Sequence, residues 1–261
     1  MIVDCFTFND EFDLLELRLS ILDPYVDQFV IVESRTTFAD EAKPLHFQEN
    51  RDKFKKWEHK IKHYVNEGIY TDEEMEQARI SPNTGGSPRW MNEFLQKEQI
   101  QKALTHLDEE DIVFVGDVDE IWSPEALKGI EGIKKLKLRV YTYYLNLRSN
   151  EEFWGTIKAR YKDIKGQCLN HLRNAAPEKN TKDYEGWHFT SQGGLEAVKK
   201  KLKDQYNIGV FDENAENSLQ SRFGVKDFIG RDFKLEVDES EWPTYLKENR
   251  EKYKHLLKPT E

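Results

Sequence analysis

The sequence predicts a single α/β domain with a mainly parallel central sheet flanked by helices. Strand-like and helix-like segments alternate along residues 1–122, a pattern typical of parallel sheets with helical crossovers. Polar side chains follow the strand-like segments, at the end where such sheets bind ligands. The composition, 38% hydrophobic and 12% aromatic over 261 residues, suffices for one large core. Because no repeat or linker divides the chain, we predict one domain over residues 1–261.

The hydrophobic periodicity predicts the elements of the first half in order. Short apolar runs predict strands, and longer segments with apolar residues over most of a helical surface predict helices. The predicted strands are 2–8, 26–32, 61–65 and 112–116, and the predicted helices are 12–22, 50–57 and 89–107. The stretch 66–88 is polar and ends in SPNTGGSP, which predicts a mobile loop.

The second half has a less regular pattern. A short helix is expected after Ser123 and Pro124, ending near residue 133. The remaining predicted elements are strands at 138–147, 153–164 and 186–190, a helix from Gly193 to about Tyr206, and a helical tail at 242–257. The order of elements therefore places the parallel part of the sheet in the first half.

Charge and cysteine content argue against several classes of protein. The net charge of −10 makes the chain a poor general binder of nucleic acid, because phosphate affinity needs clustered Lys and Arg. Two cysteines are too few for a disulfide framework, which favours a reducing, cytoplasmic environment. No apolar stretch approaches the ~20 residues of a membrane helix, and the N-terminus lacks the basic region of a signal peptide.

A group of three carboxylates, Asp117, Asp119 and Glu120, follows the strand predicted at 112–116. Carboxylates so close together repel unless a cation or a proton lies among them. An Asp-x-Asp pair at a strand end suits Mn²⁺ or Mg²⁺, which prefer carboxylate oxygens and keep positions open for phosphate. A plain turn or helix-capping cluster is the alternative.

Two other enzyme classes share this context. Haloacid-dehalogenase phosphatases place Asp-x-Asp on their first strand, with Thr or Val two residues after the second Asp, whereas this motif follows the fourth strand and has Ile121 there. Nucleotidyltransferases usually add a glycine-rich basic loop near the N-terminus, and none is visible in this sequence. Both classes remain alternatives, as does a glycan-binding module without catalytic activity.

Five ordered blocks of sequence together resemble glycosyltransferase family 17, whose best-known members are β-1,4-mannosyl-glycoprotein β-1,4-N-acetylglucosaminyltransferases. The blocks are FNDEFDLLELRLSILDPYVDQFVIVES, TFADEAKPLHFQEN, RWMNEFLQKEQIQKAL, GDVDEI and GWHFTSQGGLEAVKKKL. The resemblance implies a GT-A fold, with 1–122 as the nucleotide-binding half and 123–261 as the acceptor half with C-terminal helices. It also implies a metal-dependent, inverting transfer of a sugar such as GlcNAc from a UDP-linked donor to a glycan.

The resemblance assigns roles to the acidic motif. Asp119 is expected to bind Mn²⁺ or Mg²⁺ directly, and Asp117 to meet the ribose or the metal through water. Glu120 is expected to orient these groups or to contact the donor sugar. His188 is the expected second metal ligand, since imidazole suits Mn²⁺. Without the resemblance, a histidine among aromatic side chains is more often structural.

Other residues are expected to bind the nucleotide sugar. They are Phe8, Asn9 and Asp10 after the first strand, Glu33 after the second, Arg89 and Glu93 at the start of the helix before the motif, and Lys201. Each has a structural alternative, such as helix capping by Asn9, a surface position for Glu33 or a solvated helix position for Arg89.

The acceptor side is less defined by the sequence. Trp154 and Trp187 could stack on sugar rings or pack in the core. An inverting transferase needs a general base for the acceptor hydroxyl, and the candidates are Glu120, Glu151, Glu152 and Asp163. The segment 148–185 matches the family poorly, so the sequence identifies neither the base nor the acceptor.

Overall fold

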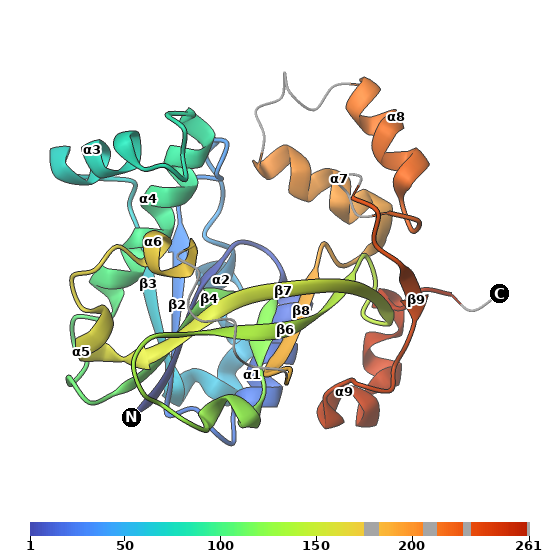
Figure 1. Ribbon diagram of the computed structural model, residues 1–261, viewed down its shortest axis with the longest axis horizontal. Coiled ribbons are helices and arrows are strands. Elements are labelled where there is room, and N and C mark those ends of the chain that lie inside the picture. Colours follow the sequence, from blue (N-terminus) through green and yellow to red (C-terminus); the bar gives the residue numbers. More distant parts are fainter. Residues whose placement is uncertain (175–182, 206–212, 227–230, 260–261) are drawn as a thin grey trace.

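The computed structural model describes residues 1–174, 183–205, 213–226 and 231–259. Over these ranges the chain forms one curled sheet of nine strands with helices packed around it (Figure 1). The strand order is β3-β2-β1-β4-β7-β6-β8-β5, and β9 pairs with β7. No helix in the described ranges is long and apolar enough to span a membrane.

The first half of the chain supplies the parallel part of the sheet. Its strands are β1 (Ile2–Phe8), β2 (Gln28–Ser34), β3 (Ile61–Asn66) and β4 (Ile112–Asp117). Neighbouring strands among these four all run parallel, and the β1–β4 register sets Thr7 opposite Asp117. The predicted strands of this half are confirmed, and their polar ends meet at one edge of the sheet.

The second half adds strands of mixed direction. They are β5 (Glu120–Trp122), β6 (Lys134–Thr142), β7 (Leu147–Arg160), β8 (Gly186–Thr190) and β9 (Leu235–Val237). β7 is antiparallel to β4 and β6, while β8 is parallel to β6 and antiparallel to β5. The predicted α/β architecture with flanking helices is confirmed, and its sheet is mixed beyond β4.

The helices confirm some predictions and correct others. Helices α1 (Phe12–Leu22) and α7 (Gly194–Gln205) lie where predicted, and α4 (Pro88–Ala103) ends four residues early. The predicted loop 66–88 instead contains α3 (Asp72–Ile80), because Thr71 and Glu74 form a reciprocal capping box. The helical segments not yet named are α2 (His46–Glu49), η1 (Arg51–Lys60), η2 (Pro124–Leu127), α5 (Tyr161–Ile164), α6 (Leu169–Asn174), α8 (Glu213–Arg222), α9 (Thr244–Glu248) and η3 (Arg250–Leu256).

Three boundary predictions in the middle of the chain are wrong. The helix expected up to residue 133 is only η2, which ends where Lys128 becomes extended, and Gly129 and Gly132 with positive φ keep the following segment non-helical. The strand expected at 138–147 is β6 at 134–142, and the next strand starts at 147 rather than 153. A turn with Tyr143 at φ 68° separates the two strands, and such a turn has no clear signature in an apolar run.

The core lies on both faces of the parallel strands. Along β1, Phe6 and Phe8 pack on one face of the sheet, and Val3 and Cys5 pack on the other. This alternation follows from the two-residue repeat of a strand. A strand that is apolar on both faces needs cover from both sides, which explains the continuous apolar run at the N-terminus.

Candidate active site

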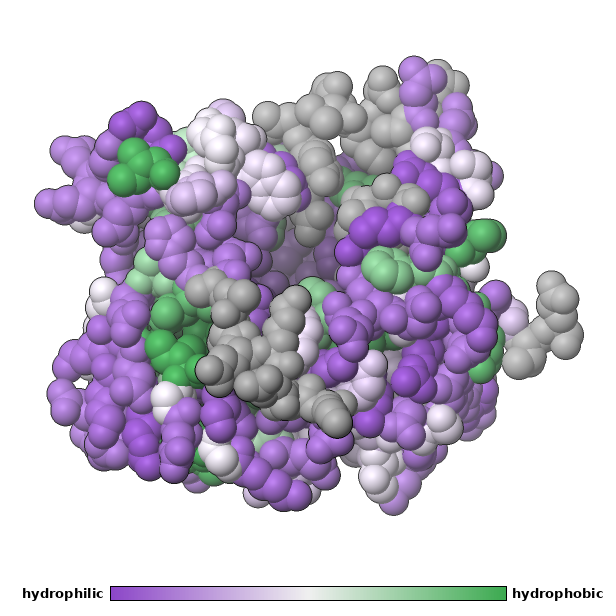
Figure 2. All heavy atoms as spheres, viewed as in Figure 1, coloured by the Kyte–Doolittle hydropathy of each residue, from purple (hydrophilic) through white to green (hydrophobic). Residues whose placement is uncertain are grey.

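A cavity of about 570 Å³ lies at the carboxyl ends of β1 and β4. It corresponds to the hollow in the middle of the face shown in Figure 2, between the sides that carry α4 and α7. Its walls come from the segments after β1 and β4, from α4, from β8 and from α7. The lining includes these residues expected from the sequence: Phe8, Asn9, Asp10, Glu93, Asp117, Asp119, Glu120, His188 and Lys201.

A fully buried arginine on α1 holds the acidic motif in place. Arg18 donates to the backbone carbonyls of Asp117 at 2.9 Å, Val118 at 3.3 Å and Glu120 at 2.7 Å. Its other nitrogens form a two-point ion pair with buried Asp4, at 2.7 Å each. The turn after β4 is therefore fixed by charge-assisted hydrogen bonds rather than by packing alone.

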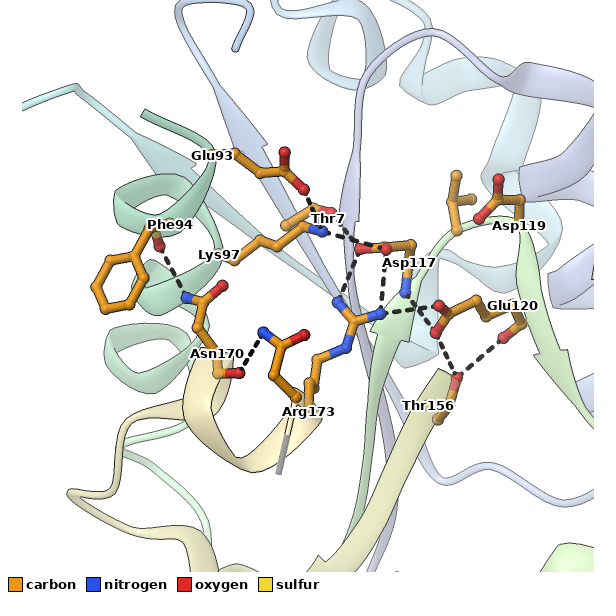
Figure 3. A network of polar contacts seen from close by, with 12 residues as sticks. Thr7, Glu93, Phe94, Lys97, Asp117, Asp119, Glu120, Thr156, Asn170 and Arg173 are labelled. Carbon is orange, nitrogen blue, oxygen red and sulfur yellow. Dashed lines mark hydrogen bonds and ion pairs between the residues drawn. The ribbon is translucent and has the colours of Figure 1, made fainter. Parts of the chain in front are cut away.

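A second arginine binds two of the three motif carboxylates (Figure 3). Arg173, on α6, contacts both oxygens of Asp117 at 3.1 Å and Glu120 Oε1 at 2.8 Å. Lys97, on α4, approaches Asp117 Oδ2 at 3.3 Å, and Thr156 on β7 donates to Glu120 Oε2 at 3.0 Å. The repulsion expected between Asp117 and Glu120 is thus relieved by protein cations.

These cations explain the ionisation of Asp117. Burial alone would raise the pKa of its carboxyl group, but Arg173 and Lys97 outweigh burial and hold the pKa far below its usual value. Asp117 is therefore a carboxylate at any physiological pH. Burial would likewise lower the pKa of Lys97, but Asp117 and Glu93 raise it, and Glu93 Oε1 lies 2.8 Å from the ammonium group.

Asp119 lies apart from the Arg173 network (Figure 3). It faces a different pair of groups. His188 Nε2 is 3.7 Å and Lys201 Nζ is 3.3 Å from Asp119 Oδ2. Burial would raise the pKa of Asp119, but Lys201 and His188 lower it well below the usual value. Burial would lower the pKa values of His188 and Lys201, but Asp119 raises both. The three side chains form a charged group on one wall of the cavity.

The sheet register and two glycines make room for the motif. β5 pairs with β8 so that Glu120 lies opposite His188. A Cβ atom at Gly116 would lie 2.3 Å from Thr156 Oγ1 and 2.8 Å from Glu120 Oε2. A Cβ atom at Gly155 would lie 2.8 Å from the same carboxyl group. Both positions therefore require glycine for Glu120 to fit beneath the cavity floor.

Polar groups also line the cavity beside α1 and α7. Lys200 pairs with Asp10 and, at 3.0 Å, with Asp204. Asn9 Nδ2 lies 3.4 Å from Asp204 Oδ2. Burial, Asp10 and Asp119 raise the pKa of Glu11, with Lys201 opposing them. This wall carries several charges of both signs that a polar ligand could rearrange.

The donor set offers two ligands to a metal ion. Asp119 contributes an oxygen and His188 a nitrogen, and Mg²⁺-type sites commonly use one or two protein ligands together with phosphate oxygens and water. Within the described ranges, no group of three or more His, Cys, Asp and Glu side chains has metal-binding geometry. Asp117 is bonded to Arg173 at both oxygens, and a metal at Asp119 would displace the ammonium group of Lys201.

Two residues expected to bind the nucleotide sugar, Glu33 and Arg89, lie outside the cavity, and so do the two tryptophans, for which sugar stacking and core packing were both open. Glu33 is fully buried and accepts the backbone N–H of Phe47 at the start of α2, at 2.9 Å. Arg89 stacks on Trp90, and neither Glu33 nor Arg89 lines the cavity. Trp187 packs in the core and donates to the Glu241 carbonyl. Trp154 is half-buried outside the cavity, with Lys137 above its ring.

The four base candidates have different surroundings. Glu120 is only 1% exposed and is bonded to Arg173 and Thr156. Glu152 pairs with Lys137, and Asp163 belongs to α5; neither is among the described residues that line the 570 Å³ cavity or the smaller cavity next to it. Glu151 lines a second, smaller cavity next to the first.

No direct signal in the sequence points to Arg18, Lys97, Thr156 or Arg173. Arg18 is one of four polar residues in helix α1, and nothing in the sequence alone distinguishes it from the other three. Arg173 lies in the segment that resembles the family poorly. Its partners are 53 and 56 positions away in the sequence, so only the fold brings them together.

Comparison with known proteins identifies the family. The model of glycosyltransferase family 17 matches residues 1–191. The β-1,4-mannosyl-glycoprotein 4-β-N-acetylglucosaminyltransferases of rat and human are each 28% identical over 127 residues, 46% of this chain and 21% of theirs. The match thus spans about a fifth of the length of these relatives. No solved structure matches the chain significantly. The extent of the family match shows that this chain belongs to glycosyltransferase family 17.

Proposed function

We propose that this protein is a metal-dependent, inverting glycosyltransferase with a GT-A type fold. In this proposal it transfers GlcNAc from a UDP-linked donor to a glycan acceptor. Family membership supports glycosyl transfer, and the N-acetylglucosaminyltransferase activity named for the rat and human relatives supports GlcNAc as the sugar. The observation that carries the proposal is the cavity at the ends of β1 and β4, with Asp119, His188 and Lys201 on one wall.

The cavity has the size and chemistry for a nucleotide sugar. Ligand sites for small molecules and cofactors usually measure about 300–1,000 Å³, and this one measures about 570 Å³. It opens at the carboxyl ends of parallel strands, where α/β sheets bind nucleotides. Phe8 and Asn9 would contact the nucleoside, and Lys201 would contact the diphosphate. These assignments follow from their places in the lining.

Asp119 and His188 are the proposed metal ligands, with Lys201 moving from Asp119 to a phosphate oxygen. A bound Mn²⁺ or Mg²⁺ would neutralise the charge that develops on the leaving diphosphate. Arg173 and Lys97 keep Asp117 ionised and stationary, and Arg18 keeps the backbone of the motif stationary. The chain's own part in the reaction is thus to hold charges in place before the substrate arrives.

In the proposed reaction one bond breaks as another forms. The anomeric carbon loses its bond to the diphosphate oxygen and gains a bond to the acceptor oxygen from the opposite face. The acceptor hydroxyl gives its proton to a base, and UDP leaves with the electron pair of the broken bond. Glu120 is poorly placed as this base, because Arg173 and Thr156 bind both of its oxygens.

Thermal unfolding with UDP, with and without Mn²⁺, tests the proposal. UDP at 100 times its dissociation constant should stabilise the protein by about 2.7 kcal/mol, roughly a 5 °C rise in midpoint for a chain of this length. The shift should require the metal and disappear in Asp119→Asn but not in Asp163→Asn, which lies outside the cavity.

Other results would redirect the assignment. No shift with UDP and metal, together with no hydrolysis of any nucleotide sugar, would contradict the proposal. Phosphate release from simple phosphomonoesters, lost in Asp117→Asn, would support a phosphatase instead. Saccharide binding without nucleotide or metal, and without any transfer, would support a glycan-binding module.

A further inference from the structure

We propose that the second cavity binds one uncharged sugar residue of the acceptor. The inference rests on the proposed function. This cavity measures about 290 Å³ and is lined by Thr142, Ser149, Glu151, Phe153, His188, Thr190 and Arg231. Phe153, His188 and Thr190 also line the first cavity, so the two spaces share a wall.

The shared wall has the arrangement that direct transfer needs. In an inverting displacement the acceptor hydroxyl approaches the anomeric carbon from the face opposite the diphosphate. The acceptor site must therefore adjoin the sugar end of the donor site. The rings of Phe153 and His188 lie 4.0 Å apart at 32° and form this boundary. His188 faces Asp119 of the first cavity with Nε2, and its ring also borders the second cavity.

Two polar atoms at the second cavity lack partners among the residues that the structure describes. Thr142 Oγ1 and His188 Nδ1 are both buried, and neither makes a hydrogen bond within those residues. Thr142 is only 2% exposed, so burial withdraws its hydroxyl from water. A buried polar group without a partner destabilises a protein by about 1–3 kcal/mol. Neither atom is exposed in this conformation, so each side chain would turn towards the cavity to pair with a ligand hydroxyl, which both donates and accepts hydrogen bonds.

The charges of this cavity favour an uncharged ligand. Besides His188, which pairs with Asp119 of the first cavity, its charged side chains are Glu151 and Arg231, whose oxygen and nitrogen atoms lie 2.7 Å apart. Because the pair is already neutralised, it offers hydrogen bonds without an excess charge of either sign. The cationic side chains Lys97, Lys200 and Lys201 line the first cavity instead. The diphosphate therefore belongs in the first cavity, and a neutral sugar with hydroxyl groups suits the second.

The size fits a single ring. A volume of about 290 Å³ is at the small end of ligand sites, which measure about 300–1,000 Å³. Phe153 gives the cavity one aromatic face, and carbohydrates commonly stack their C–H faces on such rings. The combination of one aromatic ring, several hydroxyls and one neutralised ion pair indicates a terminal pyranose rather than a peptide or lipid.

Binding of simple glycosides to the whole chain tests the inference. Saturation-transfer NMR would be recorded with UDP and Mn²⁺ present. The probes are methyl glycosides of mannose, glucose, galactose and N-acetylglucosamine, with methyl glucuronide as the charged comparison. At least one uncharged glycoside should bind. Thr142→Val and Glu151→Gln should each weaken that binding about tenfold, the effect of losing one hydrogen bond to a sugar.

Two controls separate the second cavity from the first. Glu152→Gln alters the neighbouring carboxylate, which is exposed and pairs with Lys137, and glycoside affinity should not change. UDP affinity, measured by calorimetry on the same samples, should stay within about twofold of wild type in all three variants. Thr142→Val should also unfold no earlier than wild type, since it removes a hydroxyl that has no partner among the described residues.

The outcomes distinguish this inference from the proposed function. If UDP binds but no uncharged glycoside does, or if both cavity variants bind glycosides as wild type does, the second cavity is not the acceptor site. The same conclusion follows if UDP displaces the glycoside or if only methyl glucuronide binds. If UDP does not bind the wild type, the proposed function is wrong. Glycoside binding that still depends on Thr142 and Glu151 would then show that the second cavity binds a sugar independently of a nucleotide.

Discussion

Replacing Arg18 with methionine should destabilise the whole fold and loosen the acidic motif. The guanidinium group is fully buried, and so is its partner Asp4. Arg18→Met would leave the Asp4 carboxylate inside the protein, and among the described residues its one remaining side-chain donor would be the indole N–H of Trp122, at 2.9 Å. It would also remove the donor of three backbone carbonyls between residues 117 and 120.

The magnitude follows from these lost contacts. Breaking a buried ion pair by removing one partner typically reduces the free energy of unfolding by about 3–5 kcal/mol. For a chain of this length, unfolding entropy converts that loss into a fall of roughly 5–9 °C in midpoint. The matched control is Arg51→Met, which breaks an ion pair with Glu58 between side chains about half exposed. Such a pair contributes at most about 1 kcal/mol.

Urea unfolding, followed by tryptophan fluorescence, measures both effects. The double variant Asp4→Asn with Arg18→Met removes the stranded charge and keeps an acceptor for the Trp122 indole. It should therefore be more stable than Arg18→Met alone, and a double-mutant cycle should give a coupling of about 1–3 kcal/mol. If Arg18→Met lowered the free energy of unfolding by less than about 1 kcal/mol, as little as Arg51→Met, the reasoning would be refuted.

Three further predictions use other groups of the site. Arg173→Met should lower the free energy of unfolding by about 3 kcal/mol, because it leaves the buried carboxylate of Glu120 without its cationic partner. Urea unfolding measures this change, and Arg173→Lys should lower the free energy of unfolding by less. Asp119 outweighs burial and raises the pKa of His188, so the pair's stabilisation is fully present below about pH 6.5 and declines as pH rises through the raised pKa. The stability difference between wild type and His188→Gln should shrink from pH 6 to pH 9, and a growing difference would contradict this sign. Burial raises the pKa of the Cys168 thiol to about 11, so at pH 8 its reaction with a disulfide reagent should be about 100-fold slower than in the urea-unfolded chain.

The sequence predicted the first half of the fold well, for a physical reason. β1, β2 and β4 are buried on both faces, so their sequences are mainly apolar, although β1 also contains Asp4 and Thr7, and the strands end at or just before polar residues. The prediction failed where the pattern is local and weak. α3 depends on the capping box of Thr71 and Glu74 rather than on an apolar face, and it buries only Ala78.

The candidate site was predictable in part. Residues at the ends of β1 and β4 converge because parallel strands share one edge, and the sequence locates those ends. Glu33 also ends a strand, but the start of α2 and His63 take up its carboxylate. Which polar strand end meets the ligand depends on how the neighbouring loops fold over it. The pattern of polar and apolar residues along the sequence does not contain that information. The partners of Arg173 depend on the same missing information.

The acidic motif joins distant places in the sheet. β4 lies in the interior of the strand order and β5 at its far end, yet only Val118 and Asp119 separate these strands along the chain. A two-residue connection allows little movement, and Arg18 holds its backbone in place through three hydrogen bonds. The end of β4 and the start of β5 should consequently keep a fixed separation. Inserting a flexible glycine pair after Val118 would lengthen this connection, and the distance between Asp117 and Asp119 would then become variable.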